Sequence, residues 1–219
     1  MKPPKVILWE VDAQADFMLP GGKLYVPGAE RIIPNVERLV QVAREGRAFL
    51  VSSGDAHAPD DAEFRVFPPH CVKGTPGARI IPQGLTENYF TVPNEASFPL
   101  PARILDYQQV VLEKQNLDVF DNPKAGELVR LIGETPGSNA EAGIEYVVFG
   151  VVTEYCVRCA AKGLLERGWK VAIVKDAVET IKPEEGRRTL DELAALGARL
   201  ITTDEALTMV GAAHSQTPN

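Results

Sequence analysis

Three cysteines and three histidines are the residues of this 219-residue chain best suited to covalent or metal chemistry. Cys156 is the strongest candidate nucleophile, because only three residues separate it from the apolar run 149–152 and a helical pattern follows it. A thiol in the first turn of a helix faces unpaired backbone N–H groups and the positive end of the helix dipole. Both lower its pKa and favour the nucleophilic thiolate. The alternative is a small buried hydrophobe, the commoner role of cysteine.

A second group of reactive side chains lies in the segment 54–103, which is rich in Pro and Gly and weak in periodicity. Asp55 and His57 are two positions apart, so an extended backbone places both on one side. Two imidazoles with one or two carboxylates form a mixed ligand set that suits zinc, manganese or iron. We expect one divalent ion, zinc in the first place, although a polar loop with scattered histidines is the alternative. The candidate ligands are Asp55, His57, Glu63 and His70, with Asp60 and Asp61 as rivals of Glu63.

The histidine count limits how Cys156 could be activated. If His57 and His70 bind metal, the one remaining histidine is His214, close to the C-terminus. No imidazole is then left for a Cys–His dyad. A carboxylate or an ammonium group must therefore take the thiol proton and stabilise the thiolate.

Two such groups follow predicted strands. Asp12 comes directly after the apolar run Val6–Val11, and Lys114 comes shortly after the run 109–112. Each has an ordinary explanation, since Asp is frequent in turns and Lys is usually solvated. In a parallel sheet, however, ligands bind beyond the carboxyl ends of the strands, where both residues would lie. We therefore expect Asp12 and Lys114 to meet Cys156 at that edge.

The elements that must position these residues alternate along the chain between short β-rich runs and helical periodicity. This pattern predicts an α/β fold of the three-layer α/β/α type, with a mainly parallel central sheet. No repeat, linker or composition break divides residues 1–219, so we expect a single domain, with an exposed loop at 133–143 and a flexible tail at 211–219. The predicted strands are 6–11, 47–53, 109–112, 146–152, 170–174 and 198–201, and the predicted helices are 27–46, 121–132, 154–167, 183–196 and one from 203 or 204 onward.

Composition and charge exclude several classes of function. The formal net charge is −7, so the chain lacks the basic footprint of a nucleic-acid or membrane-surface protein. An odd, sparse set of three cysteines favours a reducing compartment over a disulfide scaffold. The first apolar run is too short for a signal peptide or a membrane span, and we expect a cytoplasmic protein.

An ordered set of motifs resembles the isochorismatase-like cysteine hydrolases, and among them most closely the nicotinamidases. The set begins with Asp-Ala-Gln-Ala-Asp-Phe at 12–17 and ends with Gly-Val-Val-Thr-Glu-Tyr-Cys-Val at 150–157. Between them lie Asp-Ala-His at 55–57, Pro-Pro-His-Cys-Val at 68–72, Gly-Thr-Pro-Gly-Ala at 74–78 and Lys114. The middle motifs, together with the candidate metal ligands, favour nicotinamidase over its relatives.

The resemblance implies a role for each matching residue. The catalytic triad would be Asp12, Lys114 and Cys156. The metal ligands would be Asp55, His57, Glu63 and His70, where Glu63 departs from the His of many family members and leaves the metal preference open. Phe17, Phe67 and Val151 would contact a planar substrate, with Phe67 in place of a common Trp. A cis peptide at Val151–Val152 would direct the Val152 N–H, beside that of Cys156, into an oxyanion hole.

The implied reaction is hydrolysis of a small, non-peptide amide such as nicotinamide or pyrazinamide, by a protein that could be a homo-oligomer. The nearest alternative is a relative that acts on a ureido, carbamoyl or maleamate-type substrate. The isochorismatase reaction itself needs no nucleophilic cysteine and fits less well. The non-enzymatic alternative is a binding or scaffold protein with the same fold. A redox protein that uses Cys156 and Cys159 as a pair is the weakest alternative.

Overall fold

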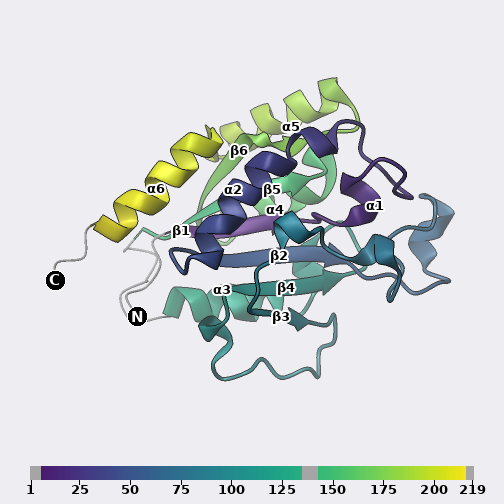
Figure 1. Cartoon of the computed structure of the whole chain (residues 1–219), viewed down its shortest axis with the longest axis horizontal. Helices are drawn as coiled ribbons and strands as arrows, with labels where there is room; N and C mark the ends of the chain where they lie inside the picture. Colours follow the sequence, from purple (N-terminus) through teal and green to yellow (C-terminus); the bar gives the residue numbers. More distant parts are fainter. Residues whose placement is uncertain (1–5, 135–142, 216–219) are drawn as a thin grey trace.

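The computed structural model describes residues 6–134 and 143–215, which build a seven-stranded, wholly parallel sheet (Figure 1). The strand order is β3-β4-β2-β1-β5-β6-β7. The strands are β1 Val6–Val11, β2 Phe49–Asp55, β3 Tyr89–Val92, β4 Gln109–Lys114, β5 Glu145–Val151, β6 Lys170–Glu179 and β7 Arg199–Ile201.

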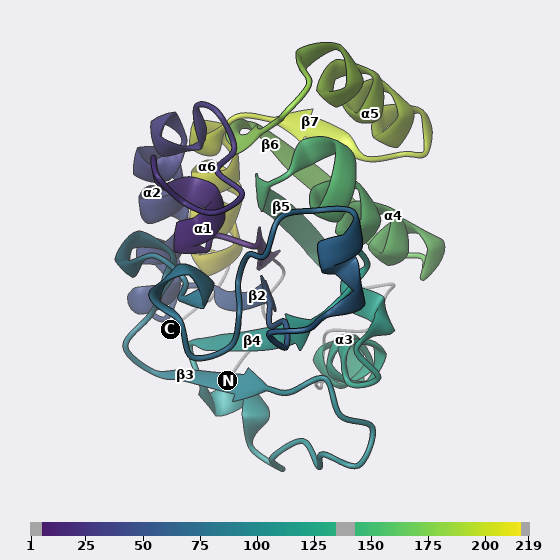
Figure 2. The same cartoon turned by 90° about the vertical axis from the view of Figure 1, so that its right-hand side faces the viewer.

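Helices cover both faces of the sheet and make three layers, as Figure 2 shows with α2 and α6 on one side and α3 and α4 on the other. The first face packs against α2 and α6, and the second packs against α3, α4 and α5. The three-layer α/β prediction with a parallel sheet is confirmed. The helices are α1 Ala15–Met18, α2 Ile33–Arg44, α3 Ala125–Glu134, α4 Arg158–Glu166, α5 Pro183–Ala195 and α6 Thr203–Ser215.

The central strands are buried on both faces, which explains their mainly apolar sequences. Every residue of β1 is buried, and Leu8 and Trp9 point into opposite cores. Within this strand Glu10 is an exception, a fully buried carboxyl group. Such a group needs polar partners inside the core, and Glu10 accepts a hydrogen bond of 2.8 Å from the Ser52 hydroxyl.

Most predicted elements are present, but several bounds were wrong: β6 continues five residues beyond the predicted strand 170–174, and α3 includes residues 133 and 134 of the predicted loop. Three further differences concern the kind of structure. The segment 54–103 contains a strand, β3, at the sheet edge. Its sequence Tyr-Phe-Thr-Val favours β structure but is short and lies in a segment rich in Pro and Gly. The helix predicted at 154–167 begins as a π-helical turn, Thr153–Val157, and continues as α4. The tail predicted from residue 211 was wrong for 211–215, which extend α6. Residues 216–219 lie outside the described part, as does most of the predicted 133–143 loop.

The strand order reverses beside β1. The chain places β2 on one side of β1 and later crosses to place β5 on the other. A parallel sheet opens a crevice at the carboxyl ends of its strands where the order reverses. Within the described residues no helix exceeds 13 residues, and none is long and apolar enough to cross a bilayer.

Candidate active site

Four neighbouring strands bring four reactive side chains to this crevice. Asp55 and Lys114 are the last residues of β2 and β4, and Asp12 directly follows β1. Cys156 lies in the π-helical turn that follows β5. Asp12 takes a φ of 49°, an uncommon value for a residue other than glycine, which turns the chain at the strand end. The sheet itself therefore assembles the groups that the sequence placed at predicted strand ends.

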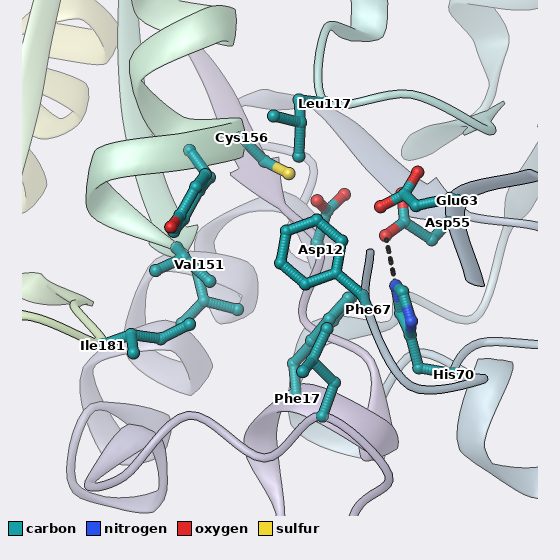
Figure 3. Close-up of a pocket in the computed structure, with 13 residues that line it drawn as sticks. Asp12, Phe17, Asp55, Glu63, Phe67, His70, Leu117, Val151, Cys156 and Ile181 are labelled. Atoms are coloured by element: carbon teal, nitrogen blue, oxygen red, sulfur yellow. Dashed lines mark ion pairs between the residues drawn. The ribbon is translucent and has the colours of Figure 1, made fainter. Parts of the chain in front are cut away.

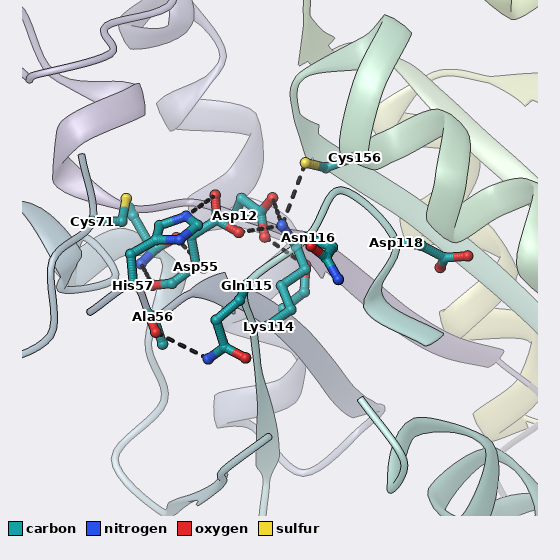
Figure 4. Close-up of polar contacts among 12 residues, drawn as sticks. Asp12, Asp55, Ala56, His57, Cys71, Lys114, Gln115, Asn116, Asp118 and Cys156 are labelled. Carbon is teal, nitrogen blue, oxygen red and sulfur yellow. Dashed lines mark hydrogen bonds and ion pairs between the residues drawn. The ribbon is translucent and has the colours of Figure 1, made fainter. Parts of the chain in front are cut away.

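Lys114 lies at the centre of this group (Figure 4). Its Nζ lies 2.9 Å from Asp12 Oδ2 and donates a hydrogen bond to Asp55 Oδ1. The same nitrogen lies 3.4 Å from the Cys156 sulfur. All four side chains are at least 94% buried, so these charges interact with little screening by water.

The two carboxylates keep Lys114 charged. Burial alone would lower the pKa of this ammonium group, but Asp12 and Asp55 raise it well above its ordinary value. The two carboxylates differ from each other. Burial raises the pKa of Asp12 despite the opposing charge of Lys114. Lys114 and the imidazoles outweigh burial at Asp55 and hold the pKa of that carboxyl low. Asp12 is thus the better proton acceptor and Asp55 the more permanent anion.

Cys156 is a neutral thiol in this arrangement, contrary to the low pKa expected from its place at a helix start. Burial raises the pKa of Cys156 well above its ordinary value, and Lys114 offsets this only in part. The negative charges of Asp12 and Asp55 also raise the pKa of this thiol. A nearby proton acceptor, rather than the helix terminus, is therefore what could produce the thiolate.

Three of the four candidate metal ligands form one buried cluster. Asp55 Oδ2 lies 3.7 Å from His57 Nε2 and 3.6 Å from His70 Nε2. One ligand atom from each residue falls within 4.8 Å of the others. His70 donates from Nδ1 to the Pro68 carbonyl at 2.8 Å, which leaves Nε2 free to bind a cation.

The fourth predicted ligand lies beside the cluster. Glu63 belongs to a 3-10 turn, Ala62–Arg65, and lines the same cavity as His70, but it is outside the three-residue cluster. Its rival Asp61 lies 3.1 Å from His57 Nδ1, the ring nitrogen opposite the cluster, where it can orient the imidazole. Asp60 is exposed.

The cluster fits a divalent cation. His57 Nε2 is buried and has no hydrogen-bond partner among the described residues. An unpartnered buried imidazole nitrogen costs free energy unless another group, such as a metal ion, satisfies it. The carboxylate and two imidazoles are the ligand types that the sequence suggested for zinc, manganese or iron.

A cavity of about 370 Å³, including the space at its mouth, joins the cluster to the candidate nucleophile (Figure 3). Its lining is mainly apolar with a few polar side chains, which is typical of small-molecule sites. Phe17 and Phe67 contribute aromatic rings to it, and both lie against the His70 imidazole, with ring centroids 5.3 and 6.4 Å away. The cavity is lined by Asp12, Phe17, Leu24, Asp55, Glu63, Phe67, His70, Leu117, Val151, Val152, Tyr155, Cys156 and Ile181.

Comparison with known proteins identifies the family to which the chain belongs. A family model described as the isochorismatase domain matches residues 6–92 and 100–205. The chain belongs to the isochorismatase family. It is a hydrolase of that family, and it has the family's parallel α/β sheet.

Individual relatives of this isochorismatase-family hydrolase cover most of its length. The pyrazinamidase of Pyrococcus horikoshii, solved in complex with zinc, has a TM-score of 0.71 and 30% identity, covering 91% of this chain and 99% of that one. The nicotinamidase of Escherichia coli (strain K12) is 24% identical and covers 91% of this chain and 95% of its own. The probable hydrolase YcaC of the same bacterium is 29% identical over 56% of this chain, which spans about half (54%) of YcaC.

Two buried residues of the first family motif support the site without entering the cavity. Gln14 Nε2 donates to the Asp55 carbonyl at 2.8 Å, and Gln14 Oε1 accepts from the Asp55 N–H at 2.7 Å. Asp16 Oδ2 accepts from the Cys71 N–H at 2.8 Å, which ties the loop after His70 to α1. The sequence motif named both residues but gave no signal of these roles, because each partner lies more than 40 positions away.

The turn before Cys156 has the backbone geometry that the family resemblance implies. The Val151–Val152 peptide is cis, and both valines line the cavity. Cys156 lines the same cavity. The oxyanion-hole role of the Val152 and Cys156 N–H groups remains a prediction for this hydrolase.

Proposed function

We propose that this hydrolase is a metal-dependent nicotinamidase that converts nicotinamide to nicotinate and ammonia through a thioester on Cys156. One arrangement supports the proposal most strongly. A thiol, a carboxylate and an ammonium group meet at one end of an apolar cavity that also reaches the Asp55–His57–His70 cluster. The zinc-bound pyrazinamidase and the nicotinamidase to which the chain is similar are consistent with this assignment.

Acylation would begin with proton transfer. Asp12 accepts the proton of the Cys156 thiol, and the Lys114 ammonium, 3.4 Å from the sulfur, stabilises the thiolate that results. The thiolate attacks the amide carbon. The N–H groups of Val152 and Cys156 would stabilise the oxyanion, a contribution of about 3–4 kcal/mol per donor in other enzymes.

Collapse of the tetrahedral adduct breaks the C–N bond. Asp12 returns its proton to the departing nitrogen. Ammonia then leaves, and the thioester remains on Cys156. Asp12 then accepts a proton from a water molecule that attacks the thioester carbon. The acid leaves, and Cys156 recovers its proton from Asp12. Lys114 stays charged throughout because Asp12 and Asp55 keep its pKa high.

Asp55, His57 and His70 would hold the divalent ion, with Glu63 beside them. A bound ion would provide a Lewis-acid contact for the ring nitrogen of the substrate, directly or through water, and so orient the amide. Phe17 and Phe67 would contact the faces of the ring, and Val151 its edge.

The charges of the cavity favour a neutral ring amide over the alternative substrates. None of the described residues that line the cavity is Lys or Arg, while Asp12, Asp55 and Glu63 are acidic. Lys114 is already paired with two carboxylates. A maleamate or carbamoyl amino acid carries its own carboxylate, which would find no free cationic side chain here and could pair only with the proposed divalent ion.

The direct test measures ammonia release from nicotinamide, pyrazinamide, maleamate and a carbamoyl amino acid, each with and without a chelator. We expect turnover of the two ring amides, with kcat/KM at least tenfold above that for the two acids, and loss of activity with the chelator. If only maleamate or the carbamoyl amino acid were hydrolysed, that compound and not nicotinamide would be assigned as the substrate. Undiminished turnover after verified metal removal would contradict metal dependence.

A further inference from the structure

A buried hydroxyl group contacts the proton acceptor of the site at the carboxylate oxygen that Lys114 does not contact. Ser53 Oγ donates a hydrogen bond of 2.7 Å to Asp12 Oδ1, and both residues are almost fully buried. Asp12 Oδ2 lies 2.9 Å from Lys114 Nζ. The two oxygens of the carboxylate therefore have different partners on different strands, which fixes the rotation of the group.

The backbone strengthens this link. The Asp12 N–H donates to the Ser53 carbonyl at 3.2 Å, so Ser53 holds Asp12 by its main chain and by its side chain. Asp12 needs such support, because its positive φ takes it out of the regular strand. A hydroxyl group can donate to a carboxylate and can accept from a carboxylic acid. The Ser53 contact can therefore persist when Asp12 gains a proton.

We propose that Ser53 is a positioning residue for the reaction: its hydroxyl fixes the Asp12 carboxylate in the orientation that accepts the Cys156 proton. This inference rests on the proposed role of Asp12 as the base. Without the hydroxyl, Asp12 keeps its ion pair with Lys114 but can rotate about it. Small misplacements of a catalytic group reduce the rate of the chemical step more than they reduce substrate binding.

The chain offers a closely matched control in the preceding residue. Ser52 is equally buried, and its Oγ donates to the Glu10 carboxyl at 2.8 Å. Successive strand residues point to opposite faces of a sheet, so the Ser52 side chain lies on the face opposite that of Ser53 and does not contact Asp12. Ser52→Ala and Ser53→Ala each remove one buried Ser–carboxyl hydrogen bond, and only Ser53→Ala removes it from the proposed base.

The experiment compares these two variants with Ser53→Thr, which retains a hydroxyl group, after thermal melting has shown that each is folded. For nicotinamide we expect Ser53→Ala to lower kcat by roughly tenfold to a hundredfold, because this factor corresponds to the free energy of one hydrogen bond to a charged group. KM should change less than about threefold. Ser52→Ala should keep kcat near that of the wild type, and Ser53→Thr should recover most of the loss. A wild-type kcat in Ser53→Ala, or equal losses in the two alanine variants, would overturn the proposal.

A second measurement separates this inference from the choice of substrate. Iodoacetamide alkylates a cysteine through its thiolate, and mass spectrometry of the Cys156 peptide follows this site alone. We expect slower alkylation of Cys156 in Ser53→Ala than in Ser52→Ala, without any amide present. If the wild type fails on nicotinamide while this difference holds, only the substrate assignment fails. Equal alkylation rates would overturn the positioning role of Ser53.

Discussion

The Lys114 ammonium lies 3.4 Å from the Cys156 sulfur, and both groups are buried. Lys114 ends β4, and Cys156 lies in the turn that follows β5. These two strands are not neighbours, since β2 and β1 lie between them. The contact exists because Lys114 extends across the ends of these strands, where it also meets Asp55 and Asp12. Stability and chemistry therefore depend on the same lysine.

Replacing Lys114 with Met should damage both properties. The variant keeps the side-chain volume but leaves two buried carboxylates without their cation, which costs about 3–5 kcal/mol. For a chain of this size, that loss lowers the Tm by roughly 10 °C. Amide hydrolysis should fall at least about a hundredfold. Calorimetry and an ammonia assay measure the two effects.

Lys73 provides the control for this variant. It forms an ion pair of 2.8 Å with Glu113, but its side chain is 49% exposed. Exposed pairs contribute roughly 0–1 kcal/mol, so Lys73→Met should change the Tm by only a few degrees. Equal effects of the two variants would show that Lys114 has no special electrostatic role.

The sequence predicted the meeting of Asp12, Lys114 and Cys156 because parallel strands present their carboxyl ends at one edge. It could not predict that burial keeps Cys156 neutral, since the burial of a helix start depends on what packs over it. Nor could it find Ser53, whose importance comes from its register beside Val11. The short strand β3 was missed because four β-favouring residues among Pro and Gly give little periodicity.

Removing the Asp61 carboxylate should weaken metal binding. Asp61 lies 3.1 Å from His57 Nδ1, and we expect this contact to orient the ring whose Nε2 faces the cluster. Loss of such an orienting contact reduces metal affinity by about 10–100-fold in other proteins. Titration with zinc should show this decrease for Asp61→Asn but not for Asp60→Asn, which changes an exposed neighbour. Equal affinities in the two variants would remove Asp61 from the metal site.

Stability should decrease as the pH rises because of Glu10. Burial raises the pKa of this carboxyl from 4.5 to about 8, although Ser52 opposes the shift. Between these pH values the native state keeps a proton that the unfolded chain has lost, so the free energy of unfolding falls as pH rises. Each unit of pKa difference contributes about 1.4 kcal/mol.

Glu10→Gln, which imitates the protonated acid, tests this account. Its stability relative to the wild type should increase from pH 5 to pH 8 and then level off. Urea unfolding at several pH values measures the difference. A difference that is constant with pH would contradict a protonated Glu10 in the native state.

Replacing Gly77 should destabilise the protein because of the neighbouring Asp16 carboxylate. A Cβ at position 77 would lie 2.2 Å from an Asp16 carboxylate oxygen, and that carboxylate holds the Cys71 N–H. Gly77→Ala should therefore destabilise the protein by about 1–3 kcal/mol. Gly126→Ala in α3, where a Cβ meets nothing within 4 Å, should instead stabilise it by up to about 1 kcal/mol. Thermal melting distinguishes these outcomes, and a neutral Gly77→Ala would show that the loop can move aside.

Direct detection of the thioester tests the central claim, that the Cys156 sulfur attacks the amide. The protein is mixed with nicotinamide, quenched in acid within milliseconds and digested, and the Cys156 peptide is weighed by mass spectrometry. We expect a mass increase of one nicotinoyl group on Cys156 in the wild type and in Cys159→Ala. Cys156→Ala should show neither the adduct nor ammonia release while still binding metal. Ammonia release by folded Cys156→Ala would contradict the account.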